Sequence, residues 1–236
     1  PRDRCAVGDS VTPYYSEPGV VLYHGDAREV LPALDLAGVS VVVTDPPYGI
    51  AQASNRGASW QGETIQGDAD TASRDGVMAQ LRHLPALVFG TWKRPPPAGT
   101  HTILVWDKGP QSGMGDLSIP WKASWEAIHV IGRGFVGKRD EGVIRGCTGV
   151  TWESRGRAHP HEKPERLLRY LISKCPPGIV LDPFVGSGST LRAAKDLGVS
   201  VIGVEIEQRY CEIAVERLRQ GVLGLWDDAT TRSVAG

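Results

Sequence analysis

The chain has 236 residues and a formal net charge of −1 at neutral pH, with 41% hydrophobic residues. This length allows one α/β domain with a full core, or two small domains. The near-zero charge argues against a generally basic nucleic-acid coat, although it leaves room for a local basic face. No apolar run approaches a membrane span, and no charged-then-apolar start suggests a signal peptide. We therefore expect a cytoplasmic protein with no membrane partner.

Four cysteines are scattered along the chain, with no spacing typical of a metal site or of a disulfide framework. They are Cys5, Cys147, Cys175 and Cys211. We interpret them as reduced thiols of an intracellular protein, and we predict no metal site.

No helix or strand is predicted for the first twenty residues. Residues 20–23 predict a strand, and Asp26 is placed to cap a helix over 27–31. Residues 39–43 form a continuous, β-branched apolar run, which is typical of a buried parallel strand. This run predicts the centre of the sheet.

A short polar turn, Thr44-Asp45-Pro46-Pro47-Tyr48, ends the central run. The two prolines stop the strand and fix the backbone. The Asp45 carboxylate and the Pro46 carbonyl can accept two hydrogens from an exocyclic amino group, while the Tyr48 ring stacks on a planar base. A merely rigid turn is the alternative interpretation.

Residues 51–67 are rich in Gly, Ser, Gln and Asn, and a loop of this length favours a lid that orders on substrate. The stretch 132–158 then loses periodicity and becomes basic and glycine-rich, so we expect it to be the least core-like part of the molecule. Between these two stretches, a helix is predicted over 72–84 and strands over 86–89, 102–106 and 124–131.

Basic residues outnumber acidic ones by nine to five between Arg133 and Arg169. Such a run is either a solvated loop or a surface that contacts phosphates. We predict a small target-recognition insert over 132–158. Its candidate DNA-binding residues are Lys138, Arg139, Arg145, Arg155 and Arg157.

Regular structure returns in the last third of the chain. The spacing of apolar residues predicts a helix over 163–175, and Pro164 suits its first turn. Strands are predicted over 179–182 and 199–204, each followed by a helix, and the tail after Gly221 is predicted to fray. Strands that alternate with helices predict one α/β domain over residues 1–236, an open and mostly parallel sheet with helices on both faces.

Four predicted strands end in an acidic residue: Asp26, Asp45, Asp182 and Glu205. Ligands of open α/β sheets bind beyond the carboxyl ends of the strands. The sequence therefore predicts a site at that edge of the sheet.

The turn from Asp182 to Thr190 joins a strand to a helix, so its glycines allow a ligand to approach the backbone and the helix N-terminus. Glu205 ends the next strand, where an acid can accept both hydroxyls of a ribose. A dinucleotide site favours a third glycine where this chain has Leu191, and Asp182 would repel phosphates. S-adenosylmethionine, which has a ribose, an ammonium and no phosphate, is therefore favoured over NAD. The candidate cofactor-binding residues here are Asp182, Phe184, Gly186, Ser187, Gly188, Ser189, Thr190 and Glu205.

With these motifs, the chain resembles the β-class, circularly permuted amino methyltransferases of DNA, which act on adenine N6 or cytosine N4. Asp45-Pro46-Pro47-Tyr48 looks like the family's catalytic motif, and it precedes the cofactor motif, as in the permuted order. The segment 159–164 is similar to the family's His-Pro-x-Gln-Lys-Pro segment, with Glu162 in place of glutamine.

The resemblance implies a Rossmann-like methyltransferase sheet, with Asp26 reaching the adenine of the cofactor and Lys163 belonging to the cofactor site. It favours adenine, because Asp is commoner at the first motif position in adenine enzymes and Ser in cytosine enzymes. The implied setting is a bacterial or phage-infected cell.

We thus expect a site-specific DNA methyltransferase that moves a methyl group from S-adenosylmethionine to the amino group of a flipped-out base in double-stranded DNA. Cytosine N4, RNA and protein glutamine remain alternative substrates, and a non-catalytic DNA-binding module is a further alternative. The short insert suggests that a homodimer or the lid over 51–67 completes the DNA contacts.

Overall fold

The computed structural model describes residues 11–50, 68–110, 117–147 and 163–220. Among these residues, nine strands form one sheet in the order β1-β2-β9-β8-β3-β4-β6-β5-β7. The strands are β1 (Tyr15–Glu17), β2 (Val20–His24), β3 (Val39–Thr44), β4 (Ala86–Gly90), β5 (Thr100–Asp107), β6 (Trp125–Ile131), β7 (Val143–Ile144), β8 (Ile179–Asp182) and β9 (Val201–Glu205).

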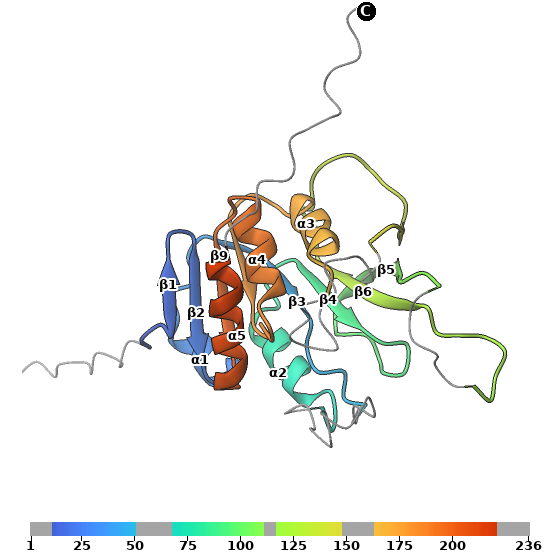
Figure 1. Cartoon of the computed structure of the whole chain (residues 1–236), viewed down its shortest axis with the longest axis horizontal. Helices are drawn as coiled ribbons and strands as arrows, with labels where there is room; N and C mark the ends of the chain where they lie inside the picture. Colours follow the sequence, from blue (N-terminus) through green and yellow to red (C-terminus); the bar gives the residue numbers. More distant parts are fainter. Residues whose placement is uncertain (1–10, 51–67, 111–116, 148–162, 221–236) are drawn as a thin grey trace, which may run out of the picture.

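The five central strands, β2, β9, β8, β3 and β4, run parallel to one another. β1 pairs antiparallel with β2, and β6 pairs antiparallel with both β4 and β5. The predicted open, mostly parallel sheet is therefore confirmed, with an antiparallel hairpin at one side (Figure 1).

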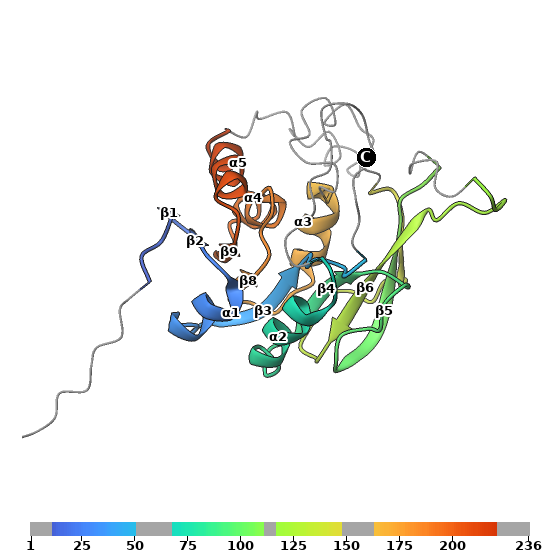
Figure 2. The same cartoon turned by 90° about the horizontal axis from the view of Figure 1, so that it is seen from below.

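Five α-helices of the described residues cover the sheet: α1 (Ala27–Val30), α2 (Ala72–Gln80), α3 (Glu165–Ser173), α4 (Ser189–Asp196) and α5 (Gln208–Arg219). A 3-10 turn, Leu31–Ala33, follows α1. Figure 2 shows α3, α4 and α5 on one face of the sheet and α1 and α2 on the other. No helix of the described part of the chain is long and apolar enough to cross a membrane.

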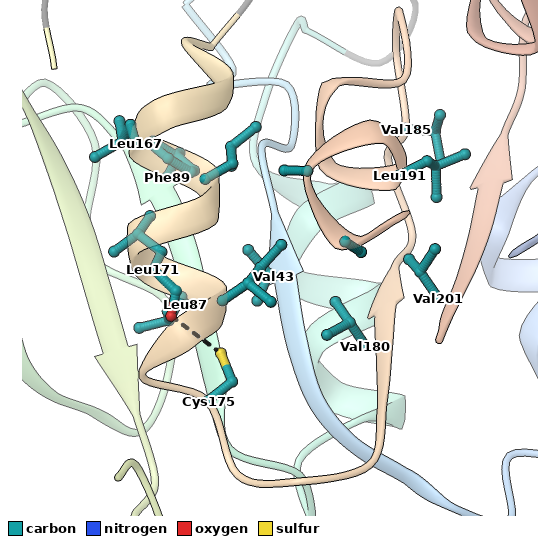
Figure 3. Close-up of a cluster of buried hydrophobic side chains, with 14 of the residues drawn as sticks. Val43, Leu87, Phe89, Leu167, Leu171, Cys175, Val180, Val185, Leu191 and Val201 are labelled. Carbon is teal, nitrogen blue, oxygen red and sulfur yellow. Dashed lines mark hydrogen bonds between the residues drawn. The ribbon is translucent and has the colours of Figure 1, made fainter. Parts of the chain in front are cut away.

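Two apolar cores result from the alternation of side chains along each strand. On β3, Val41 and Val43 face α3, α4 and α5, whereas Val42 faces α1 and α2. α3 contributes a stripe of leucines to the larger core (Figure 3), where Leu167 and Leu171 are fully buried. Each such leucine contributes roughly 1.5–3 kcal/mol through burial. The site is thus carried on a rigid three-layer scaffold.

The structure differs from the sequence-based expectations in two places. β1 forms within the first twenty residues, where no element was predicted. The helix predicted to reach residue 84 ends at Gln80. The stretch 132–158 is not devoid of core residues: Ile144 and Cys147 are buried, and the Trp106 indole N–H donates to the Cys147 carbonyl oxygen at 2.9 Å. The expectation that 132–158 is the least core-like part of the molecule stays a prediction, and within it Ile144 and Cys147 are buried.

Some predictions concern residues outside those described. The lid over 51–67, the candidate DNA-binding residues Arg155 and Arg157, and the tail after Gly221 all belong to this group.

One edge of the sheet carries the polar ends of the strands. We call it the carboxyl edge and define it as the edge at which β2, β3, β8 and β9 end. The parallel pairing aligns His24 with Glu205 and Asp182 with Gly203, so Asp26, Asp45, Asp182 and Glu205 come to the same edge. Because β6 is antiparallel, its first residues also lie there, beside the end of β5.

Candidate active site

The turn after β3 is held by a charged network. The Tyr48 hydroxyl donates to Asp45 Oδ1 at 2.9 Å, and the Lys163 ammonium donates to Asp45 Oδ2 at 2.6 Å. Lys163 also lies 3.1 Å from the Tyr48 hydroxyl and is only 7% exposed. Lys163 was predicted to belong to the cofactor site, but its ammonium lies against the predicted catalytic turn.

Glu126, near the start of β6, is a second acidic partner of this lysine. Its Oε2 lies 3.3 Å from Lys163 Nζ and accepts from the Tyr48 hydroxyl at 3.2 Å. Its Oε1 accepts from Lys108 Nζ at 2.8 Å. Two carboxylates and two ammonium groups therefore balance in one half-buried cluster, and the Lys163 cation also lies 5.0 Å from the Phe89 ring centroid.

The pKa values follow from burial and from these pairs. Burial raises the pKa of Asp45 by more than Lys163 lowers it. Burial would also raise the pKa of Glu126, but Lys163 and Lys108 outweigh it and bring that pKa down to about 2. For Lys163, burial acts to lower the pKa, and the two carboxylates raise it above its usual value instead. Glu126 and Lys163 are therefore charged at neutral pH.

Hydrogen bonds hold both backbone groups of Gly49, the residue after Tyr48. The Gly49 N–H donates to Asp68 Oδ1 at 2.6 Å, and the Arg94 guanidinium donates to the Gly49 carbonyl oxygen. Gly49 has φ of +70°, and a Cβ there would lie 2.5 Å from the Asp70 carbonyl carbon. This position therefore requires glycine, and the turn is fixed in one conformation.

The second turn, between β8 and α4, begins at Asp182. Asp182 Oδ1 accepts from the Thr44 hydroxyl at 2.7 Å and from the Phe184 N–H at 3.1 Å, which ties this turn to the end of β3. The side chain is 1% exposed, and burial raises its pKa to about 6 despite hydrogen bonds from Thr44 and Thr190. Asp182 and Asp45 thus lie on neighbouring strands at one edge.

The two glycines of the second turn, Gly186 and Gly188, have different structural roles. A Cβ at Gly188 would lie 2.7 Å from the Ala214 Cβ, so Gly188 permits close packing against α5. A Cβ at Gly186 would meet nothing within 4 Å, so Gly186 faces open space. Ser187 and Thr190 are buried beside it, whereas the Ser189 hydroxyl accepts from Arg217 at 2.6 Å and serves the packing of α5.

Glu205 connects the turn to the end of β9. Its Oε2 accepts from the Gly186 N–H at 2.7 Å and its Oε1 from the Glu207 N–H at 2.8 Å, and burial raises its pKa. Each oxygen keeps a further lone pair for a ligand. Asp26 caps α1 by accepting from the Arg28 N–H at 2.9 Å, and the Arg28 guanidinium lowers its pKa.

S-adenosylmethionine fits the groups at this edge. The open side of Gly186 leaves room for a ligand, and Asp182 and Glu205 supply acceptors for an ammonium and for ribose hydroxyls. Phe184 is half-buried beside them. The residues predicted for the cofactor thus come together, with Lys163 as the exception.

The candidate DNA-binding residues separate into two groups. Arg145 follows β7, which runs parallel to β5, so it lies toward the carboxyl edge, and it pairs with Glu141 at 3.0 Å. Lys138 and Arg139 are exposed beside the end of α3, where Lys174 Nζ donates to the Lys138 carbonyl oxygen. That end of α3 is opposite to Lys163, so the prediction for Lys138 and Arg139 stays a prediction without support from their position.

The sequence-based prediction missed Glu126, Lys108, Thr44 and Arg94. Glu126 meets Tyr48 across 78 residues and Arg94 meets Gly49 across 45 residues. No local spacing signals such partners, because pairing in the sheet brings them together. Thr44 precedes Asp45 and was quoted only as part of the turn.

The fold is that of DNA methyltransferases of known structure. The PvuII DNA methyltransferase (cytosine-N4-specific) superposes with a TM-score of 0.65 at 15% identity, over 89% of this chain and 90% of that one. The complex of M1.HpyAVI with S-adenosylmethionine superposes with a TM-score of 0.57 at 22% identity, over 84% of this chain and all of that one.

The sequence itself gives the family. The N6/N4 DNA methylase family model matches residues 99–216, half of the chain. The chain belongs to this family, and it is a DNA methyltransferase.

Two curated relatives match over most of their length. The type II methyltransferase M2.LlaDCHI of Lactococcus lactis subsp. cremoris is 28% identical over 89% of this chain and 93% of its own. The type II methyltransferase M.ScaI of Streptomyces caespitosus is 26% identical over 87% of this chain and 83% of its own. M.HinfI of Haemophilus influenzae is 46% identical over 79 residues, which are 31% of this chain and 22% of that protein.

Proposed function

We propose that the protein transfers a methyl group from S-adenosylmethionine to N6 of adenine at a specific sequence of double-stranded DNA. The observation that carries this proposal is the Asp45 carboxylate at the carboxyl edge, one strand away from Asp182 and beside the Tyr48 ring. An amino-group acceptor and a cofactor turn on adjacent strands are what a direct methyl transfer requires.

An exocyclic amino nitrogen is a weak nucleophile, because its lone pair is delocalised into the base. When Asp45 and the Pro46 carbonyl accept its two hydrogens, the lone pair localises on nitrogen and points away from the acceptors. Asp45 Oδ2 already accepts an N–H donor, the Lys163 ammonium, at 2.6 Å. The amino group of a base is a donor of the same kind, so it suits this oxygen.

When bound, S-adenosylmethionine supplies an electrophilic methyl group on a sulfonium. The protein mainly provides position, because an in-line displacement proceeds once the reacting atoms are roughly 3–3.5 Å apart. The new N–CH₃ bond forms as the S–CH₃ bond breaks, and the amino nitrogen must then lose one proton. Asp45 is placed to take that proton, and its raised pKa favours this role. The proton passes from there to solvent.

Inside a duplex the amino group is out of reach of Asp45, so the base must leave the stack and lie on the Tyr48 ring. The choice of adenine rests on the aspartate at the first position of the motif. Cytosine N4 is the second candidate, because the same two acceptors serve either amino group.

Mass spectrometry of nucleosides from DNA methylated by the purified protein tests the proposal. Unmethylated plasmid DNA incubated with S-adenosylmethionine should yield N6-methyladenine. Exclusive N4-methylcytosine would overturn the choice of base. Competition by RNA as strong as that by duplex DNA would overturn the choice of nucleic acid.

A further inference from the structure

Exposed apolar side chains gather on two loops of the described residues. Of the nine large apolar side chains that are exposed there, four belong to the loops after β4 and before β6, and a fifth, Trp125, is the first residue of β6. Trp121, Leu117 and Trp92 are 78%, 77% and 67% exposed. We call this set the aromatic rim, and it comprises Trp92, Leu117, Ile119, Trp121 and Trp125.

The aromatic rim lies at the carboxyl edge. β4 is parallel to β3 and ends at Gly90, which pairs with Ala127 of the antiparallel β6. Trp92 follows Gly90 by two residues and Trp125 is the first residue of β6, so both lie at the edge that carries Asp45. The loop before β6 projects beyond the sheet in Figure 1.

Two residues of the rim are close in sequence to residues of the catalytic network. Trp125 is the neighbour of Glu126, which accepts from Tyr48 and pairs with Lys163. Arg94, two residues after Trp92, donates to the Gly49 carbonyl oxygen. Trp92 and Trp125 are thus close in sequence to side chains that hold the turn carrying Asp45.

Basic residues are interleaved with the rim. The described residues among 91–126 contain two acidic side chains, Asp107 and Glu126, and four basic ones, Lys93, Arg94, Lys108 and Lys122, of which Lys108 pairs with Glu126. Lys93 Nζ lies 5.9 Å from the Trp92 ring centroid. A surface of aromatic side chains with cations beside them is complementary to bases and phosphates together.

We propose that the aromatic rim contacts the DNA that flanks the flipped-out base, with Trp121 packing on base surfaces that extrusion exposes. The inference rests on the proposed function, and it names the surface by which the duplex is held at the site. The duplex has to approach the carboxyl edge to deliver a base to Asp45, and the rim projects from that edge. A second copy of this chain is the other occupant that an apolar surface would suit, and the basic residues favour DNA over it.

Substitution of Trp121 by Ala tests the proposal through binding to a fluorescein-labelled DNA duplex of mixed sequence. Loss of one aromatic contact should weaken the affinity about tenfold, because stacking of one base on an aromatic side chain has this order of magnitude. Trp92→Ala should act in the same direction. The affinity for S-adenosylmethionine should remain that of the wild type in both variants, which reports that the fold is intact.

Leu197→Ala is the matched control. Leu197 is also an exposed apolar residue, but it caps the C-terminal end of α4, opposite to the end that begins at the cofactor turn. Its DNA affinity should equal that of the wild type. Unchanged DNA affinity in both tryptophan variants would overturn the inference. So would a tryptophan variant that loses only self-association, measured by light scattering.

These outcomes are distinct from a failure of the proposed function. If the wild type methylates cytosine instead of adenine, the base is wrong, while the tryptophan variants still report on the rim. If the wild type methylates adenine and the variants bind DNA as it does, only the inference about the rim fails.

Discussion

Lys163 Nζ lies 2.6 Å from Asp45 Oδ2, so the acceptor proposed for the target amino group already has a cationic N–H donor in the free protein. The same ammonium lies 3.3 Å from Glu126 Oε2. Lys163 can therefore move toward Glu126 when a base enters, without losing a carboxylate partner. The lysine holds the turn in place and leaves the acceptor available.

Replacement of Asp45 by Ala should abolish methyl transfer, because it removes the carboxylate that we propose accepts an amino hydrogen of the base. Binding of S-adenosylmethionine should change little, since Asp182 and Glu205 retain their hydrogen bonds to the cofactor turn. Calorimetric titration with S-adenosylmethionine and a turnover assay with tritiated methyl groups measure the two effects. Turnover near that of the wild type would refute the mechanism.

Replacement of Glu126 by Gln should lower kcat by about tenfold or more, because the Lys163 ammonium then pairs with Asp45 alone and competes with the target amino group. The negative charge of Glu126 raises the pKa of Asp45, so its removal should also move the acid limb of the kcat profile to lower pH.

The pH profile distinguishes this positioning role from a loss of stability, which would lower kcat without moving the limb. Glu141→Gln is the control, since Glu141 is an exposed partner of Arg145. An acid limb of Glu126→Gln that coincides with that of the wild type would argue against the role.

Binding of S-adenosylmethionine should strengthen as pH rises through about 6. Burial raises the pKa of Asp182 to about 6, so this side chain is neutral below that pH and negative above it. The ammonium of the cofactor is charged throughout this range and prefers the ionised carboxylate. The same raised pKa means that the protein without cofactor loses stability as pH rises from about 4 to about 6.

Asp182→Asn should flatten the pH dependence of the affinity. Calorimetry between pH 5 and pH 8 measures it. The Glu205 carboxyl, whose pKa burial also raises, leaves a residual slope in the same direction. A variant with the full slope of the wild type would show that another group carries the dependence.

The predicted catalytic turn and the cofactor turn could be recognised in the sequence, because each consists of a few consecutive residues. Asp45-Pro46-Pro47-Tyr48 and the glycine turn after Asp182 both lie where expected, at the ends of β3 and β8. Glu126 could not be predicted, since its partners lie just after β5, in the turn after β3 and just before α3.

The contacts of Lys163 with Asp45 and Glu126 were missed for a related physical reason. In sequence it precedes the cofactor strand, but Pro164 starts α3, and this start lies at the carboxyl edge beside β3. β7 has only two residues, and it pairs with β5 where the Trp106 indole also donates to the Cys147 carbonyl across 41 residues. Such tertiary pairing leaves no periodic pattern in a short segment.

Arg145→Ala should weaken binding to DNA duplexes of any sequence and reduce the salt dependence of the affinity by about one unit of slope, as expected for loss of one phosphate contact. Arg139→Ala should have a smaller effect on both, because Arg139 lies beside the opposite end of α3. The Arg145–Glu141 pair is exposed and contributes little to stability. Binding isotherms at several salt concentrations compare the two variants. Equal effects of both substitutions would show that topology does not separate them.

We expect the protein to act as a homodimer. The stretch 132–158 is short for a recognition element, whereas single DNA-binding modules bury roughly 600–1,000 Å² of protein surface and larger readers more. The aromatic rim adds contacts near the flipped-out base, but a second subunit would extend the footprint along the duplex. Light scattering at micromolar concentration should give twice the monomer mass of 25.4 kDa without DNA, and this mass plus that of one duplex when DNA is bound. Trp121→Ala should give the same mass, because the rim faces DNA and not the partner subunit. A protein that is monomeric without DNA and binds as one monomer per duplex would contradict the expectation.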